Sequence, residues 1–198
     1  MLMLALRRQL IAYRNRLMAG DWQKSAGFCL QEPPLHDMNG STLAIIGGGA
    51  LGKGLAGAAQ ALNVRVVFAE RKDAASVRFG YVPFSEALVQ ADVVSLHCPL
   101  TPETIGLIGA EEFALMKRSA ILINTARGGL VIEDDVAEAC RTGLLAGYAT
   151  DVVDEEPMKS DHPFQSIDSI LVTPHIGSRT FESVERQALR AVTNLVEY

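Results

Sequence analysis

The sequence contains few cysteines and no long apolar run. Three of its 198 residues are cysteine, and Cys29, Cys98 and Cys140 lie far apart along the chain. This number and spacing argue against a disulfide framework or a C-x-x-C metal site. We therefore predict no metal and a reducing, cytoplasmic compartment. No apolar stretch approaches the roughly 20 residues that a membrane-spanning helix needs.

The charged residues exclude further classes of partner. The chain has 18 Lys and Arg against 23 Asp and Glu, a formal net charge of −5, and the basic residues form no block. Nucleic acid and anionic membranes are therefore poor partners. The apolar start Met1–Leu6 is very short and is followed by arginines, so we do not expect a signal peptide. With 48% hydrophobic residues, the chain can form a buried core, and its 198 residues fit one domain with appendages.

Expected strands alternate with expected helices from residue 41 onward. The expected strands cover residues 42–47, 64–69, 92–97, 120–124, 146–151 and 170–173. The expected helices cover residues 50–62, 84–90, 110–117, 133–142 and 180–197. Residues 91–97 and 120–124 are almost continuously apolar, as strands buried on both faces are. This alternation predicts an α/β fold with a doubly wound parallel sheet.

The ends of the chain differ from this alternating region. Over residues 1–19, apolar side chains recur at helical spacing with arginines between them, so we expect one helix there. Residues 20–40 contain Pro33-Pro34 and Asn39-Gly40 and are predicted to be a loop. We divide the chain into an arm (1–40), a central domain (41–180) and a final helical segment (181–198).

A glycine motif marks the start of the central domain. Gly47, Gly49 and Gly52 have the spacing G-x-G-x-x-G, between an expected strand and an expected helix. In a dinucleotide site the first glycine allows a tight turn, the second admits the pyrophosphate and the third lets helix pack on strand. The free N–H groups and positive dipole end of the helix would hold the pyrophosphate. A plain glycine-rich turn is the alternative.

Glu70 directly follows the second expected strand, which strengthens the dinucleotide interpretation. The Glu70 carboxylate can accept hydrogen bonds from the ribose hydroxyls of adenosine, and its charge should repel a 2′-phosphate. We therefore expect NADH to be preferred over NADPH. Arg71 and Lys72 oppose this preference, because either side chain can pair with the phosphate.

Polar residues follow the later strands, whose carboxyl ends would meet at one edge of the sheet. Arg127 can bind a carboxylate through two guanidinium nitrogens. His175 can transfer a proton near neutral pH, and Glu156 can pair with it and stabilise the imidazolium form. The simpler alternatives are a surface arginine, a structural loop histidine and an exposed acid in the run 154–156.

Five segments together resemble the D-isomer-specific 2-hydroxyacid dehydrogenase family. They are Gly47–Gly52, Leu96–Thr104, Ile123–Leu130, Asp151–Pro157 and Thr173–Gly177, in family order and spacing. The resemblance implies a Rossmann domain that binds NAD and an enzyme that transfers a hydride between nicotinamide and a small D-2-hydroxy or 2-oxo acid. It implies that Arg127, Glu156 and His175 are the catalytic residues.

The resemblance also implies a set of cofactor contacts, with Asp151 at the nicotinamide carboxamide. The implied set is Gly47, Gly49, Ala50, Leu51, Gly52, Glu70, Pro99, Thr104, Thr125, Ala126, Arg127, Asp151, His175 and Gly177. Within the family, Trp22–Cys29 and the strand ending Ala69-Glu70-Arg71 are similar to the glycerate dehydrogenase (hydroxypyruvate reductase) branch. The substrate among hydroxypyruvate, glyoxylate and related acids stays open.

Family members also carry a substrate domain, built from an N-terminal segment and a C-terminal return. This chain resembles one that begins inside the helix crossing between domains and stops inside the returning helix. We therefore expect the substrate domain to be absent and the chain alone to be inactive. The first helix and loop resemble a dimer arm, which implies a homodimer. The alternatives are an NAD-sensing, corepressor-like binding module and a phosphoglycerate dehydrogenase.

Overall fold

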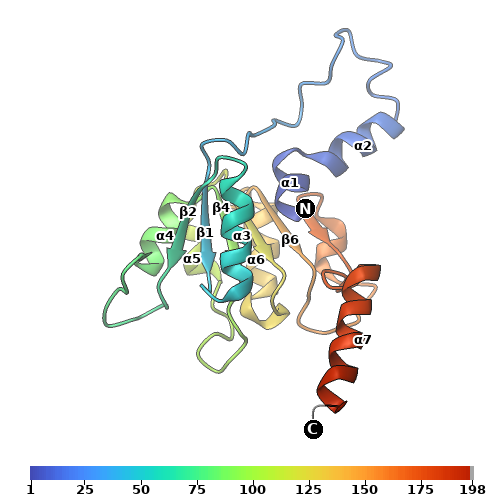
Figure 1. Cartoon of the computed structure of the whole chain (residues 1–198). Coiled ribbons are helices and arrows are strands. Elements are labelled where there is room, and N and C mark those ends of the chain that lie inside the picture. Colours follow the sequence, from blue (N-terminus) through green and yellow to red (C-terminus); the bar gives the residue numbers. More distant parts are fainter. Residues whose placement is uncertain (197–198) are drawn as a thin grey trace.

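The centre of the molecule is a seven-stranded, all-parallel β-sheet (Figure 1). In this computed structural model, which describes residues 1–196, the strands are β1 (Thr42–Ile46), β2 (Arg65–Ala69), β3 (Tyr81–Val82), β4 (Val93–Leu96), β5 (Ile121–Asn124), β6 (Gly147–Thr150) and β7 (Ile170–Val172). Their order in the sheet is β3-β2-β1-β4-β5-β6-β7. The order reverses between β1 and β4, which confirms the predicted doubly wound Rossmann fold.

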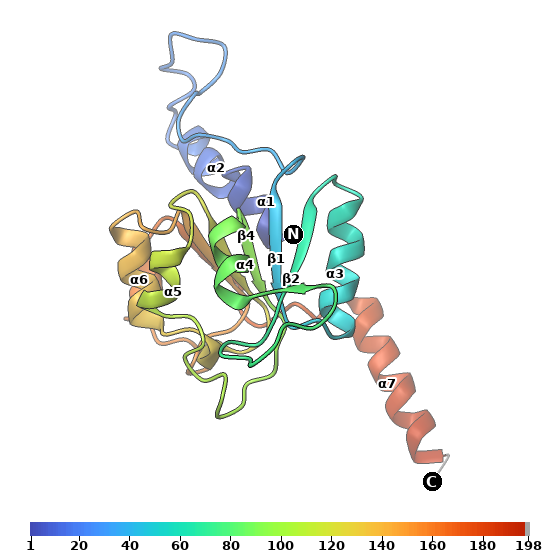
Figure 2. The same cartoon turned by 90° about the vertical axis from the view of Figure 1, so that its left-hand side faces the viewer.

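Helices cover both faces of this sheet. They are α1 (Leu2–Arg7), α2 (Leu10–Met18), α3 (Ala50–Gln60), α4 (Phe84–Gln90), α5 (Ala110–Leu115), α6 (Glu133–Arg141) and α7 (Phe181–Val196), with 3₁₀ turns η1 (Gly128–Leu130) and η2 (Pro163–Ser166). Helices α1 and α3 pack on one face, and α4, α5 and α6 pack on the other (Figure 2).

The side-chain alternation of β1 explains why its residues 43–46 are all apolar. Leu43 and Ile45 belong to the core beneath α1 and α3, whereas Ala44 and Ile46 belong to the core beneath α4–α6. Successive side chains of a strand point to opposite faces, so a strand covered on both sides needs apolar residues at every position.

The prediction of one helix over residues 1–19 is wrong. Gln9 adopts a left-handed conformation with a φ of +51°, which ends α1 and starts α2 in a new direction. Helix α1 buries Leu2 against the sheet, whereas α2 has no buried residue. The apolar pattern continues through the break and therefore did not indicate it. The direction of α1 is set by its docking onto the sheet rather than by helical periodicity.

Two further differences are small. Strand β3 was not predicted, because it has two residues and forms only by pairing with the end of β2. The final helix extends to Val196, and positions 197–198 of the predicted last segment lie outside the described residues. Within residues 1–196, no helix combines the length and hydropathy needed to cross a membrane.

Candidate functional site

The glycine loop follows β1 at the carboxyl edge of the sheet. Gly47 has a φ of +107°, and a Cβ atom there would lie 2.5 Å from the carbonyl carbon of His97. A Cβ at Gly52 would lie 2.2 Å from the carbonyl oxygen of Gly47. Side chains cannot occupy either space. Glycine is therefore required at Gly47 for the turn and at Gly52 for the close packing of α3.

Gly49 has a different environment. A Cβ at Gly49 would meet no described atom within 4 Å, and its φ of −75° is open to any residue. Gly49 precedes α3, and no side chain among residues 1–196 caps the start of that helix. Ala50 and Leu51 are exposed in its first turn. The N–H groups at this helix end therefore face open space, and these residues fit an approaching pyrophosphate.

Glu70 lies at the end of β2 and is only 3% exposed. Its carboxylate accepts hydrogen bonds from Nε and Nη2 of Arg78 at 2.6 and 2.7 Å. It also accepts the backbone N–H groups of Arg71 and Arg78 at 2.9 and 3.0 Å. The bonds from the Arg78 side chain, followed by the two backbone bonds, lower the pKa of Glu70 to about 2. The predicted acid is thus in place, with a partner that the sequence did not indicate.

The loop after β4 carries Pro99 and Thr104. The Thr104 hydroxyl donates to the carbonyl of Pro99 at 2.7 Å and accepts the N–H of Thr101 at 2.8 Å. The hydroxyl is therefore engaged in folding this loop. His97 and Cys98, which precede it, are half-buried, and burial lowers the pKa of His97 and raises that of Cys98. In both residues, burial thus favours the uncharged form of the side chain.

Asn124 shapes the loop that follows β5. It is fully buried, its Nδ2 donates to the carbonyl oxygen of Arg127 at 2.8 Å, and its Oδ1 accepts the N–H of Ala126 at 3.1 Å. Thr125 and Arg127 are exposed on this loop, where Nη1 of Arg127 donates to the carbonyl of Ala126 at 2.6 Å. The Arg127 side chain is thus presented to solvent from a rigidly bonded turn.

Glu156 and His175 are brought together from different strands. Oε2 of Glu156 lies 2.6 Å from Nδ1 of His175, and Oε1 accepts the N–H of Val153 at 3.2 Å. The bond with His175 is the main cause of a lowered pKa for Glu156, and the charge of Arg127 contributes less. Glu156 is therefore ionised at neutral pH, next to an imidazole that can carry a positive charge.

The Arg127 loop packs directly against the segment that leads to Glu156. A Cβ at Gly128 would lie 2.0 Å from the carbonyl carbon of Val153, so only glycine allows this contact. Among the described residues, Arg127 makes no hydrogen bond to Glu156 or His175. The structure therefore places the three candidate residues on neighbouring loops and joins two of them directly.

Asp151 fixes the turn that carries His175. It is 5% exposed at the end of β6, and its Oδ1 accepts the N–H of Ile176 at 2.9 Å and the hydroxyl of Thr173. Its Oδ2 accepts the N–H of Gly177 at 2.7 Å. Within this turn His175 has a φ of +53°, a conformation uncommon for any residue but glycine. The bonds of Asp151 hold this turn in place.

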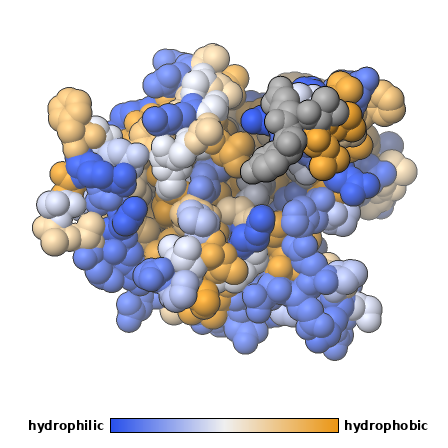
Figure 3. Space-filling view, turned by 60° about the horizontal axis from the view of Figure 1, so that its bottom comes forward, coloured by the Kyte–Doolittle hydropathy of each residue, from blue (hydrophilic) through white to orange (hydrophobic). Residues whose placement is uncertain are grey.

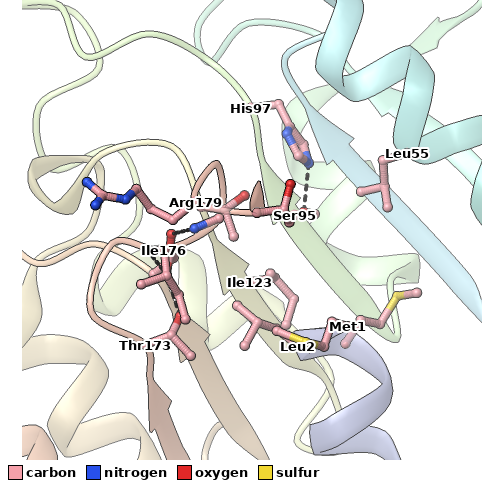
Figure 4. A pocket seen from close by; sticks show the side chains of 14 residues that line it. Met1, Leu2, Leu55, Ser95, His97, Ile123, Thr173, Ile176 and Arg179 are labelled. Atoms are coloured by element: carbon pink, nitrogen blue, oxygen red, sulfur yellow. Dashed lines mark hydrogen bonds between the residues drawn. The ribbon is translucent and has the colours of Figure 1, made fainter. Parts of the chain in front are cut away.

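A cleft of ≈ 650 Å³ lies beside these loops. Its lining includes the polar residues Ser95, His97 and Asp151 at the ends of β4 and β6. In Figure 4, Met1 and the first α1 residue, Leu2, lie below His97 and Ser95, and Leu55 of α3 lies to one side. Figure 3, turned toward this edge, shows hydrophilic and hydrophobic surface interspersed. Polar or charged side chains make up half of the cleft's 14 lining residues, and this combination with apolar side chains fits a small-molecule site.

Sequence reasoning missed two residues that organise the site. Asn124 carried a signal, because asparagine before a turn often bonds nearby backbone. Arg78 carried none, since it is eight residues from Glu70 within an irregular loop. Only the folded path of residues 71–80 shows that the two side chains meet.

Comparison with known proteins identifies the family. The model of "D-isomer specific 2-hydroxyacid dehydrogenase, NAD binding domain" matches residues 1–177. The chain belongs to this family. Membership confirms the resemblance seen in the sequence motifs and the prediction of NAD as the cofactor.

Proteins related to this chain align with most of its length. Glycerate dehydrogenase of Methylorubrum extorquens is 44% identical over 196 residues, which are 98% of this chain and 61% of that protein. Hydroxypyruvate reductase of Blautia hydrogenotrophica is 36% identical over 95% of this chain and 60% of its own length. The TT0316 protein of Thermus thermophilus has a TM-score of 0.88 and 39% identity over 98% of this chain and 61% of that structure. The chain spans about 60% of the length of these relatives.

Proposed function

We propose that this chain is the cofactor-binding part of an NAD-dependent D-2-hydroxyacid dehydrogenase. The reaction would transfer a hydride between nicotinamide and C2 of a small 2-hydroxy or 2-oxo acid. The observation that carries the proposal is the 2.6 Å contact between His175 and Glu156, at the sheet edge that also presents the glycine loop and Arg127.

The three candidate catalytic residues would have separate tasks. Because Nδ1 of His175 is engaged by Glu156, Nε2 is the ring nitrogen left to donate a proton to the carbonyl oxygen of the 2-oxo acid. Glu156 would hold the imidazole in orientation and stabilise its charged form. The exposed Arg127 guanidinium would bind the substrate carboxylate and polarise the carbonyl. When bound, the nicotinamide supplies or accepts the hydride.

The cofactor would lie along the carboxyl edge of the sheet. We propose that Gly47, Gly49 and Gly52, with the exposed N–H groups of Ala50 and Leu51, hold the pyrophosphate. The loops after β4 and β5 would flank it through Pro99, Thr104, Thr125, Ala126 and Arg127, while His175 and Gly177 would adjoin the nicotinamide. A carboxylate accepts about four hydrogen bonds. Asp151 uses three within its turn, which leaves one position for the carboxamide.

We propose boundaries for the parts of the chain as well. Residues 41–180 would form the NAD-binding domain, residues 1–40 an interdomain or dimer arm, and residues 181–198 a return helix. The exposed apolar side chains of α7 support a role in contacts beyond this domain: Phe181, Val184, Leu189, Val192 and Leu195. Figure 1 shows α2 and α7 projecting from the sheet. We propose that the protein is a homodimer, which light scattering can test, and that it is located in the cytoplasm.

The names of the relatives suggest which acids to test. Glycerate dehydrogenase and hydroxypyruvate reductase indicate hydroxypyruvate or D-glycerate, and glyoxylate reductase of Thermococcus litoralis, 36% identical over 205 residues, indicates glyoxylate. Phosphoglycerate dehydrogenase is the alternative within the same chemistry, so phosphohydroxypyruvate belongs in the substrate panel.

The deciding experiment joins this chain to the part of a relative that it does not span. In this chimaera, the chain replaces the matching 61% of the M. extorquens glycerate dehydrogenase. We expect NADH oxidation with hydroxypyruvate or glyoxylate, measured by nicotinamide absorbance, and none from the 198-residue chain alone. NADH binding without turnover of any acid would favour the second candidate, an NAD-sensing, corepressor-like binding module.

A further inference from the structure

The carboxylate that should receive the adenosine ribose is already fully engaged. An ionised carboxylate offers about four acceptor positions. Glu70 uses four, two for the Arg78 side chain and two for the backbone N–H groups of Arg71 and Arg78. A ribose hydroxyl can bond Glu70 only by displacing one of these donors. The group that an incoming adenosine meets first at this position is therefore the Arg78 guanidinium.

Arg78 is held in this position from two sides. Its guanidinium carbon lies 4.0 Å from the centroid of the Tyr81 ring, a cation–π arrangement. Tyr81 belongs to β3 and pairs with Phe68 of β2. A Cβ at Gly48 would lie 2.1 Å from the Tyr81 hydroxyl oxygen, so the ring adjoins the glycine loop. Arg78 thus lies between the glycine loop and the end of β2.

Part of the Arg78 guanidinium remains available to a ligand. Its side chain is 54% exposed, and Nε and Nη2 carry its bonds to Glu70. Among residues 1–196, Nη1 makes no hydrogen bond. Guanidinium groups bind phosphate oxygens through paired N–H donors more favourably than they bind neutral acceptors.

The neighbouring cations are placed differently. Lys72 pairs with Glu112 at 2.7 Å, which in turn accepts the N–H of Gly109. The Arg71 side chain is exposed, and only its backbone N–H contacts Glu70. Among these three cations of the described chain, Arg78 is the one fixed against the Glu70 carboxylate.

We propose that Arg78 sets the selectivity between NADH and NADPH, because its pairing with Glu70 neutralises the acid and presents a cation to a 2′-phosphate. This inference rests on the proposed cofactor site along the carboxyl edge. Glu70 alone would reject NADPH, whereas the Glu70–Arg78 pair accepts both cofactors. We expect the dissociation constants of the native chain for NADH and NADPH to differ by less than about tenfold, since a guanidinium–phosphate contact offsets the repulsion from Glu70.

The test compares both cofactors on variants of the 198-residue chain by fluorescence titration. Arg78→Gln leaves Glu70 charged and without its cationic partner, so NADPH binding should weaken by about tenfold or more. NADH binding should stay equal or become tighter, because two acceptor positions of Glu70 become free for the ribose. Glu70→Gln should shift the ratio toward NADPH. Arg118→Gln removes an exposed arginine before β5, at the opposite edge of the sheet, and should leave the ratio unchanged. An unchanged ratio of the NADPH and NADH dissociation constants in Arg78→Gln would overturn the inference. If that ratio changed in Arg71→Gln instead, the role would belong to Arg71.

A second measurement uses the native chain and does not depend on the folding of any variant. Calorimetric titration compares 5′-AMP with adenosine 2′,5′-bisphosphate, which differ only in the 2′-phosphate. We expect the bisphosphate to bind at least as tightly, with a steeper loss of affinity as salt is raised. Binding of 5′-AMP without binding of the bisphosphate would refute the role of Arg78. Absence of binding by NADH, NADPH and both nucleotides would instead refute the proposed cofactor site itself.

Discussion

The Nδ1 atom of His175 lies 2.6 Å from Oε2 of Glu156, a residue 19 positions earlier in the chain. The contact depends on two turns at the carboxyl edge of the sheet. One presents Glu156 after β6, and the other holds His175 at a φ of +53° through the bonds of Asp151. The first turn follows the buried strand β6 and the second follows the half-buried strand β7, so the sheet sets the position of the pair. Because each residue is held by its own turn, one can be substituted while the other keeps its position.

Substitutions in the glycine loop should separate folding from cofactor binding. Gly49→Ala adds a methyl group where no described atom lies within 4 Å, so the thermal midpoint should stay within about 2 °C of the native value. NADH affinity should fall by about tenfold or more, since the methyl occupies the approach of the pyrophosphate. Gly47→Ala is the matched contrast and should unfold at lower temperature because of its backbone collision and positive φ. Unaltered NADH binding by Gly49→Ala would place the pyrophosphate elsewhere.

In the chimaera, loss of the proton donor should affect turnover more than binding. His175→Ala should lower kcat by about 10²–10⁴-fold, the usual contribution of a positioned acid or base. His175→Asn is a second variant, because asparagine tolerates the left-handed backbone better than alanine. Arg127→Ala should also raise KM for the 2-oxo acid, since it removes ground-state binding. His36→Ala, in an exposed loop, serves as the control. Near-normal turnover by both His175 variants would show that another group donates the proton.

Glu156→Gln should change the pH dependence of reduction. The native carboxylate has a lowered pKa, chiefly because of its bond with His175. A negative charge 2.6 Å from Nδ1 stabilises a positive charge on the ring. A neutral amide lacks this effect, so the basic limb of the kcat/KM profile should move to lower pH. The exposed neighbour Glu155→Gln is the control, since Glu155 pairs with Lys159. A basic limb that stays in place would mean that Glu156 only contributes surface charge.

The Glu70–Arg78 pair predicts a specific pH window for stability. The pKa of Glu70 falls from its ordinary 4.5 to about 2 because of its bonds with Arg78 and the backbone. A carboxylate with a lowered pKa stabilises the fold above its ordinary pKa, and this stabilisation is lost as pH falls through the folded value. Glu70→Gln should therefore melt at lower temperature than the native chain at pH 7. The difference should shrink as pH falls from 4.5 toward 2. A difference independent of pH would show that the ionised carboxylate is not what stabilises the loop.

The order of strands and helices could be predicted from the sequence, as could the residues at the strand ends. Continuous apolar runs such as residues 43–46 require burial on both faces, and Gly47 and Gly52 occupy sites where a side chain does not fit. These are local requirements of the chain, so they are visible in single segments. They placed Arg127, Glu156 and His175 at one edge, because parallel strands bring their carboxyl ends together.

The partners of these side chains were decided by the tertiary structure. Glu70 and Arg78 meet because an irregular loop returns to the end of β2, and no periodicity specifies that path. The break at Gln9 likewise depends on where α1 docks on the sheet, since the apolar pattern runs through it. Backbone hydrogen bonding and strand burial act over a few residues and leave a pattern in the sequence. Contacts between loops depend on where the whole sheet places the loop ends, and the sequence of either loop alone does not contain that information.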